Sequence, residues 1–258
     1  MKRVKKLLAA LLVLALAVSL MVPVLAAGGE KANFFRATWE KLVSWYEALR
    51  CKVLELWFKL FPPPPPFPYP PDTDVDYKPV IYLYPEQPTE VNVTLAPRAA
   101  RFTQTIPNYG AGWNVLAQPD GTLTNLADGK TYACLFWEAA HDTPWFRPET
   151  GFVVARADLA GFLKEKLAYL GLNDAEAGEF IEFWLPLLSR NAYNFLHFAG
   201  EEYQARYPLT ITPAPDSLLR VFMVSAPAQG SERVAPQALA PFERHGFAAI
   251  EWGGTILN

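Results

Sequence analysis

Two glutamates stand beside tryptophans in apolar runs of the sequence. Glu138 follows Leu135-Phe136-Trp137, and Glu251 precedes Trp252. A carboxyl group shielded from water by apolar neighbours has a raised pKa, which suits it to act as a general acid. With a second carboxylate at a suitable distance it forms the pair that glycoside hydrolases use. Glu138 and Glu251 are therefore candidate catalytic residues. The alternative is that both lie at strand ends and bind backbone amides or an arginine.

The same segment carries the densest polar cluster, formed by Glu138, His141 and Asp142. On a helix, Glu138 and His141 would share one face and could ligate a metal ion. The preceding run is strand-like, however, and the other histidines, His197 and His245, are far away in the sequence. The chain also lacks a Gly-x-Ser-x-Gly motif and a glycine-rich phosphate loop. We expect neither a metal site nor a cofactor.

Aromatic residues make up 14% of the chain, with eight tryptophans and eleven tyrosines. Most should lie in the core. Tyr82 and Tyr84 share one face of a strand, because alternate residues of a strand point the same way. Together with Trp137 they are the candidate binding residues, since exposed aromatic rings can stack on sugar rings in a groove.

Residues 1–26 have the pattern of a signal peptide. Met1 to Lys6 carries four positive charges, Leu7 to Leu25 is apolar apart from Ser19, and Val24-Leu25-Ala26 offers a cleavage site. The apolar run is also long enough for an uncleaved anchor. Either alternative predicts an exported protein, secreted or tethered to the outer face of the cytoplasmic membrane. Without its four basic residues the formal charge falls from −3 to −7, which argues against nucleic-acid binding.

Residues 27–61 are predicted to contain an amphipathic helix. Apolar residues from Phe35 to Leu60 recur at alternating spacings of four and three. Three interpretations fit this pattern: self-association in a coiled coil, contact with a membrane surface, or packing on the domain. We leave all three open.

Residues 62–76 are predicted to form a linker. Pro62 to Pro71 is mostly proline and should be a stiff, extended spacer. Three aspartates follow, Asp72, Asp74 and Asp76. They do not form a calcium loop of the EF-hand type, because the required glycine and glutamate are missing. We interpret them as a solvated linker end.

Residues 77–258 should form one α+β domain, antiparallel and β-rich, with a helix pair on one side. Val80–Tyr84 and Val91–Leu95 read as an opening hairpin. Asp158–Leu170 and the segment from Asn173 to Pro186 have helical spacing, with a glycine stop at Gly171 and a capping box at Asn173. The other predicted elements are strands at 102–106, 113–117, 121–126, 131–138, 209–212, 219–224 and 247–252, and a helix at 236–245. The strands at 121–126 and 131–138 should form a second hairpin around Asp128-Gly129.

Cys51 and Cys134 are the only cysteines. In an oxidising compartment they could form a disulfide, but Cys51 belongs to the predicted N-terminal helix and Cys134 to the domain. The alternative is a buried Cys134 with Cys51 free or bonded to another chain. Near the C-terminus, Gly253-Gly254 indicates a turn or a bulge.

Several motifs resemble an uncharacterised family of exported bacterial proteins. They are KPVIYLYP at 78–85, PDG at 119–121, LFWE at 135–138, GFVV at 151–154, WLP at 184–186 and RHGFAAIEWGG at 244–254. The resemblance covers residues 78–258 and implies a bacterial envelope or extracellular setting. The family has no established activity, so it assigns no functional residues.

These observations predict an exported cell-envelope protein that displays a binding or structural module on a stiff spacer. Its partner would be an envelope glycan or a protein. The alternative is a hydrolase of an envelope polysaccharide that uses Glu138 and Glu251.

Overall fold

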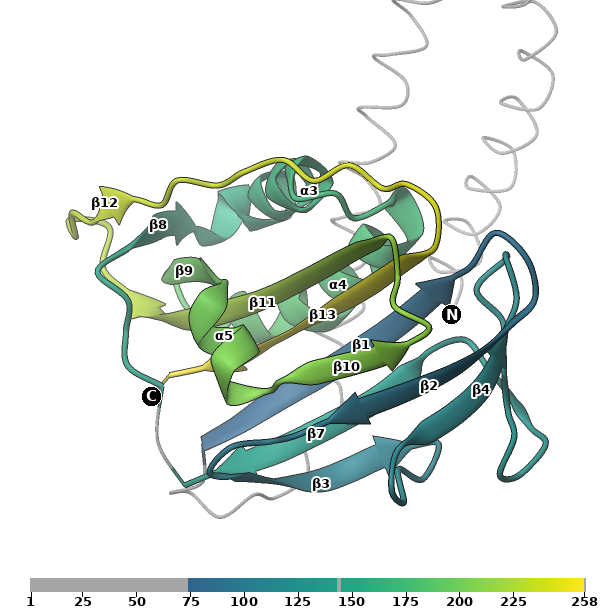
Figure 1. Cartoon of the computed structure of the whole chain (residues 1–258). Helices are drawn as coiled ribbons and strands as arrows, with labels where there is room; N and C mark the ends of the chain where they lie inside the picture. The colour runs from purple at the N-terminus through teal and green to yellow at the C-terminus, as the bar shows by residue number, and fades with distance from the viewer. Residues whose placement is uncertain (1–73, 143–144, 258) are drawn as a thin grey trace, which may run out of the picture. The chain divides into compact units, whose positions relative to one another are not determined.

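The computed structural model describes residues 74–142 and 145–257 (Figure 1). All of them belong to the second of two compact units, residues 65–258. The predicted signal peptide, the 27–61 helix, the proline run and Cys51 lie outside the described residues. No helix of the described part is long and apolar enough to cross a membrane.

The larger of two sheets has eight strands in the order β12-β8-β9-β11-β13-β1-β7-β3. Neighbouring strands are antiparallel except for the pairs β11–β13 and β8–β12, which are parallel. The strands are β1 (Asp74–Tyr84), β3 (Ala100–Ile106), β7 (Leu135–His141), β8 (Thr150–Ala155), β9 (Tyr193–Ala199), β11 (Ser217–Ala228), β12 (Ala235–Pro236) and β13 (Ala248–Ile256).

The smaller sheet is antiparallel and has five strands in the order β10-β2-β4-β5-β6. Its strands are β2 (Thr89–Leu95), β4 (Trp113–Ala117), β5 (Leu123–Asn125), β6 (Thr131–Tyr132) and β10 (Leu209–Thr212). The helices are a 3-10 turn (Arg156–Asp158), α3 (Leu159–Tyr169), α4 (Asp174–Leu188) and α5 (Glu201–Arg206). The predicted α+β class is confirmed.

The elements form three layers, with α3 and α4 on one face of the eight-stranded sheet and the five-stranded sheet on the other (Figure 1). Two apolar cores separate the layers. The helix-side core contains Leu163 of α3, Trp184 of α4 and Trp252 of β13. The inter-sheet core contains Trp113 of β4 and Trp137 of β7. Strands of the large sheet are therefore buried on both faces, which explains their nearly continuous apolar sequences.

The predicted helix pair is confirmed, with one correction at its end. The Asn173 side chain accepts a hydrogen bond from the Glu176 N–H at 2.9 Å, and the Asn173 N–H donates to Glu176 at 3.0 Å, which completes the capping box. Gly171 has φ +100°, the left-handed conformation expected after α3. Pro186 does not end α4 but lies within its last turn.

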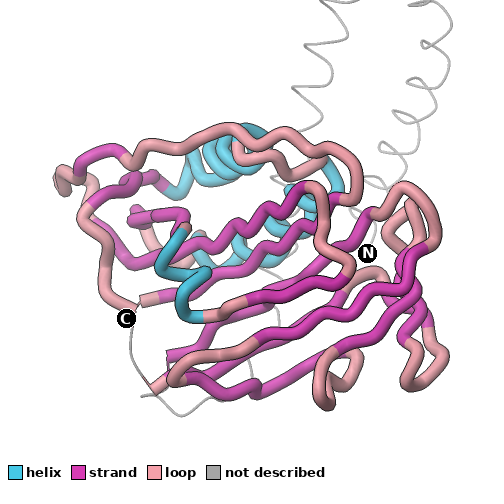
Figure 2. Tube along the Cα trace, in the orientation of Figure 1, coloured by secondary structure: helices cyan, strands magenta, loops and turns pink. Residues whose placement is uncertain are grey.

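The structure contradicts four other predictions. The strand predicted at 131–138 is two strands, since β6 pairs with β5 in the small sheet whereas β7 belongs to the large sheet. β1 and β2 do not form a hairpin, because β1 lies between β13 and β7 whereas β2 lies between β10 and β4 in the other sheet. Residues 236–245 are not a helix: after Pro236 the chain is a loop that passes over α3 (Figure 2). Asp76 is no solvated linker residue, since it belongs to β1 and is fully buried.

Gly253 and Gly254 lie inside β13 and form no turn, but the bulge of β1 lies opposite Gly253. Both are sites of close approach. A Cβ on Gly253 would lie 2.8 Å from the Pro79 Cα, and one on Gly254 would lie 2.5 Å from the Met223 carbonyl oxygen. The pair of glycines therefore lets neighbouring strands and α4 pack against β13.

Candidate functional site

The two candidate carboxylates project from opposite faces of the large sheet. Ile250 and Trp252 pack in the helix-side core, so Glu251 between them faces the inter-sheet core. Trp137 packs in the inter-sheet core, so the adjacent Glu138 faces the helices. The structure therefore does not bring Glu138 and Glu251 into one cleft, and the pair required for glycoside hydrolysis is not formed.

Glu251 is fully buried and bound by side chains of the sheet. It forms an ion pair with Arg220 of β11 and accepts a hydrogen bond from the Trp137 indole at 3.1 Å. Arg220 also donates to the Tyr207 carbonyl oxygen at 2.8 Å and lies over the Tyr203 ring. Because Tyr203 and Tyr207 come from α5 and the segment after it, this network ties β11 and β13 to the connection that leads into the small sheet.

A second network of buried polar side chains, centred on Asp76, lies in the same inter-sheet core. Its carboxylate accepts a hydrogen bond from the Trp145 indole at 2.8 Å and lies 3.4 Å from His141 Nε2. Burial and the nearby Asp76 raise the pKa of Tyr207 well above its ordinary value. These side chains have almost no contact with solvent, so they hold the layers together and offer no open site.

Glu138 stabilises a β-bulge in β1. The pairing between β1 and β7 shifts register between Asp76 and Val80, and Lys78 within this shift has φ +49°. The Lys78 N–H donates to Glu138 Oε1 at 3.3 Å. Glu138 thus satisfies a backbone group that the bulge displaces, which is the structural alternative to catalysis.

Glu138 and His141, the two residues considered as metal ligands, both belong to β7. They are three residues apart on β7 and therefore point to opposite faces of the sheet. No group of three or more potential metal ligands occurs within residues 74–142 and 145–257.

The three candidate aromatic residues do not form an exposed stacking surface. Trp137 is completely buried. Tyr82 is 5% exposed and donates to Glu179 Oε2 at 2.6 Å. Tyr84 stacks on Tyr82 with ring centres 6.3 Å apart and lies beneath the Arg244 guanidinium. Burial raises the pKa of both tyrosines. The two tyrosines pack in the helix-side core, and Trp137 packs in the inter-sheet core.

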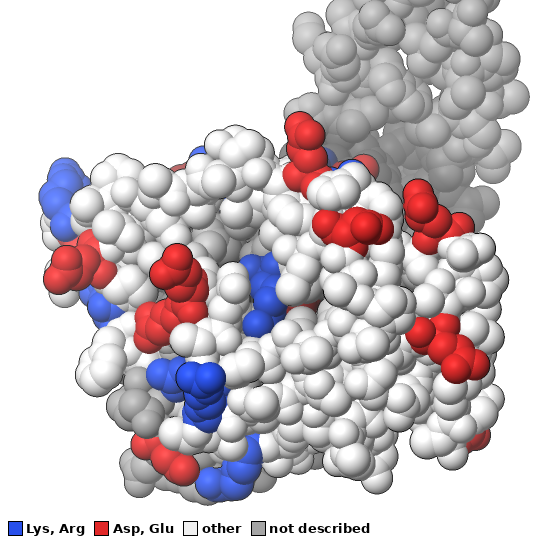
Figure 3. Space-filling model, viewed as in Figure 1, with Lys and Arg blue, Asp and Glu red and all other residues white. Residues whose placement is uncertain are grey.

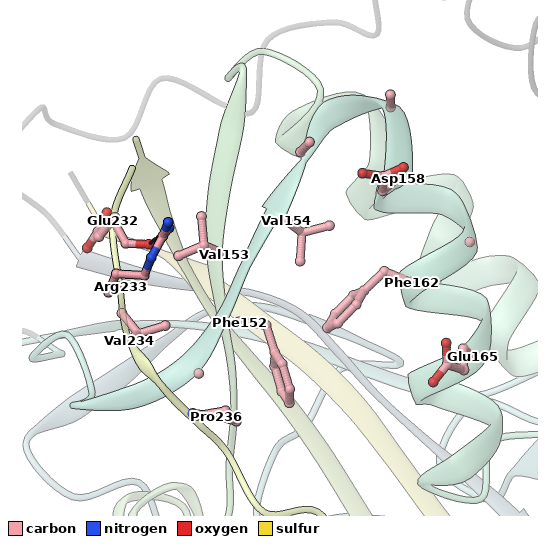
Figure 4. A pocket seen from close by; sticks show the side chains of 14 residues that line it. Phe152, Val153, Val154, Asp158, Phe162, Glu165, Glu232, Arg233, Val234 and Pro236 are labelled. Atoms are coloured by element: carbon pink, nitrogen blue, oxygen red, sulfur yellow. Dashed lines mark hydrogen bonds between the residues drawn. The ribbon is translucent and has the colours of Figure 1, made fainter. Parts of the chain in front are cut away.

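An open groove of about 730 Å³ lies elsewhere, between β8, α3 and the segment around β12 (Figure 4). The strand supplies Gly151 to Ala155 as its floor, and α3 supplies one wall with Gly161, Phe162 and Glu165. The opposite wall is the segment from Glu232 to Pro236. The view in Figure 4 shows Phe152, Val154 and Phe162 directed into the space between β8 and α3.

The groove combines an apolar wall with charged ends. Phe152 and Phe162 pack with ring centres 5.2 Å apart, and the Lys166 ammonium group lies 5.8 Å from the Phe162 ring centre. Glu232 is paired with Arg147, outside the groove lining. Asp158, at the start of α3, is exposed and forms no hydrogen bond or ion pair within the described part of the chain. Its carboxylate is available to a ligand.

The floor of the groove is an incompletely paired sheet edge. β9 pairs with β8 from Phe152 to Ala155, but on the outer side β12 pairs only with Thr150 and Gly151. No other described strand covers that side of residues 152–155. An unpaired edge next to an apolar wall is a typical binding surface for an extended chain.

This groove was missed by the sequence predictions. The motif Gly151-Phe-Val-Val154 lies in β8, where no strand is predicted, although its Phe and Val residues favour one. The helix predicted at 236–245 overlaps the two-residue strand β12 at Pro236, and no strand is predicted there. An edge strand that short carries no periodic signal, so the groove could not be derived from the sequence.

On the face seen in Figure 3, acidic and basic residues are scattered over a mostly uncharged surface, and basic side-chain atoms lie in a hollow near its middle. A second, smaller pocket of about 370 Å³ is lined by residues that include Trp145, Arg147 and Leu257. The large exposed apolar side chains of the described part come from separate segments of the chain. They are Ile106, Leu126, Phe146, Tyr169, Tyr193 and Leu218.

Comparison with known proteins gives one short similarity. A segment of 66 residues is 46% identical to an "Uncharacterized protein in bglA 3'region" of Butyrivibrio fibrisolvens, and it covers 24% of this chain and 66% of that protein. No protein-family model matches the chain. No solved structure matches it either.

Proposed function

We propose that this chain is an exported bacterial binding module that takes its ligand in the groove between β8, α3 and β12. The proposal rests on the groove, which has a volume of about 730 Å³. It places apolar side chains, an available carboxylate and unpaired strand backbone next to one another. Ligand sites in proteins have this combination of an apolar lining and few polar groups.

Export and the bacterial setting are part of the same proposal. The basic and apolar pattern of residues 1–26 supports it, and so do the motifs that resemble an uncharacterised family of exported bacterial proteins. The similarity to the Butyrivibrio fibrisolvens protein agrees with a bacterial origin. The separation of Glu138 from Glu251 on opposite faces of the large sheet supports a binding role over the hydrolase alternative.

The chain offers a variant that should block the groove without disturbing the fold. Gly161 lies on α3 and lines the groove, and a Cβ built on it meets no atom within 4 Å. Gly161→Leu should therefore project a side chain into the groove. Gly178 of α4 is the matched control, because its Cβ also meets nothing within 4 Å and it lies outside the groove.

The experiment screens the full chain against an immobilised pool of random heptapeptides and a panel of cello-, xylo- and chito-oligosaccharides. We expect one class to bind the wild type and the Gly178→Leu variant and to lose at least tenfold in affinity for Gly161→Leu. If neither class binds, or if Gly161→Leu binds as tightly as the control, the groove is not the binding surface.

A further inference from the structure

We propose that the groove binds an extended polypeptide, which adds to the open edge of β8 as a further strand. This inference rests on the proposed function and names the class of its ligand. It follows from the direction of the backbone groups of β8, from the side chains beside them and from a comparison with the other sheet edges.

The backbone groups that face the groove can be assigned from the pairing with β9. The Arg156 N–H donates to the Ala192 carbonyl oxygen on the β9 side. In an antiparallel pair, alternate residues direct both backbone groups to the same partner. The backbone N–H and C=O groups of Phe152 and Val154 therefore point to β9. Those of Val153 and Ala155 point to the open edge. The Ala155 carbonyl starts the 3-10 turn as its N-cap, which leaves three groups for a ligand.

Three backbone groups of β8 have no hydrogen-bond partner among the described residues. They are the Val153 N–H, the Val153 carbonyl and the Ala155 N–H. They continue the line along which β12 already pairs with Thr150 and Gly151. A polypeptide supplies matching donors and acceptors at the strand repeat, whereas a glycan does not. A bound peptide would thus pair with residues 153–155 of β8, next to the two residues with which β12 already pairs.

The side chains beside the edge define the sequence of the bound peptide. One side of the groove is lined by Phe152, Val154 and the Phe162 ring of α3. The peptide side chain on that side should therefore be apolar. The Asp158 carboxylate stands at the end of the groove where β8 leads into α3. A lysine or arginine of the peptide should lie there.

The other described sheet edges lack these properties. β3 has a register shift between Phe102 and Gln104. β10 is followed by Pro213 and preceded by Pro208, and β6 has only two residues. Bulges, prolines and short strands are the devices by which proteins prevent strand addition. β8 instead has a groove alongside it.

The test uses a proline substitution that removes one outward donor. Val153→Pro deletes the N–H that faces the groove and leaves the ladder with β9 intact, a position where edge strands tolerate proline. Val153→Ala is the control for loss of the side chain. The full chain and both variants are used to select from a displayed library of random heptapeptides, with thermal unfolding as a check of the fold.

We expect the wild type and Val153→Ala to enrich peptides that carry an apolar and a basic residue, and Val153→Pro to bind them about tenfold more weakly. Methylating single amide nitrogens of a selected peptide should weaken binding to the wild-type protein at alternate positions. This second measurement needs no protein variant.

Two results would overturn the inference. One is a set of peptides that bind wild type and Val153→Pro equally and tolerate every N-methylation. The other is a lack of enriched peptides while an oligosaccharide binds and is lost in Gly161→Leu, in which case the groove remains a binding site with a different ligand. If neither class binds, the proposed function fails as well.

Discussion

Arg220 of β11 and Glu251 of β13 form an ion pair inside the core between the two sheets, where both side chains are almost inaccessible to solvent. Neighbouring parallel strands place them side by side, since Arg220 and Glu251 are register partners. A carboxylate held in this way is a structural element.

The first prediction concerns this pair. Glu251→Gln should lower the free energy of unfolding by about 3–5 kcal/mol, because it leaves the Arg220 charge buried without its partner. Replacing both residues, as in Arg220→Met with Glu251→Leu, should recover part of the loss. Urea unfolding of the three proteins measures the difference. Equal stability of Glu251→Gln and the wild type would contradict the structural role.

Arg244 is predicted to anchor the loop between β12 and β13. Its guanidinium pairs with Glu176 and donates to the Gly171 carbonyl oxygen at 2.7 Å, so it joins the loop to the start of α4. Arg244→Lys should not replace it, since a single ammonium group cannot hold both acceptors in this geometry. Hydrogen exchange should become faster throughout 237–246 in this variant. Unchanged exchange there would show that the loop is held by other contacts.

The glycines of β13 and α4 allow a matched comparison. Gly254→Ala should destabilise the protein by about 3 kcal/mol or more, because its Cβ would lie 2.5 Å from the Met223 carbonyl oxygen and 2.7 Å from the Trp184 ring. Gly178→Ala, in the middle of α4 with open space around it, should stabilise it by up to about 1 kcal/mol. Thermal unfolding of both variants measures whether Gly254→Ala destabilises the protein and whether Gly178→Ala stabilises it.

Cys134 should titrate at high pH. Burial, and next the charge of Glu179, raise the pKa of its thiol to about 11. Because the folded protein keeps the proton that an unfolded thiol has already lost, this group lowers the stability as pH rises above about 9. The rate of iodoacetamide alkylation against pH, measured on the full chain with Cys51→Ser, should give the raised value. A midpoint near 9 would contradict the burial.

The helix pair and most strands could be predicted because their signals are local. Asn173, Glu176 and Gly171 specify their own backbone conformation, and the alternation at 113–117 reproduces β4. Pairing between strands is not local. Val80–Tyr84 and Val91–Leu95 were assigned to one hairpin because they are adjacent in the sequence, yet they belong to different sheets.

The candidate site shows the same limit. The alternative interpretation of Glu138 and Glu251 correctly predicts their partners, a backbone amide for one and an arginine for the other. It is wrong about their position, because both lie inside strands and not at strand ends. Which face each one occupies depends on the register of β7 and β13, and the bulge at Lys78 shifts that register within β1. The groove beside β8 depends on where β12 stops, and no pattern in the sequence indicates that point.

Amide hydrogen exchange of β8 in the full chain tests the central claim most directly. Without ligand, the Phe152 and Val154 amides should be protected by β9, and the Val153 and Ala155 amides should exchange fast because they face the open groove. A selected heptapeptide should protect Val153 and Ala155 as well. Protection of all four amides without any peptide, or fast exchange of Val153 in its presence, would contradict an open edge that binds an added strand.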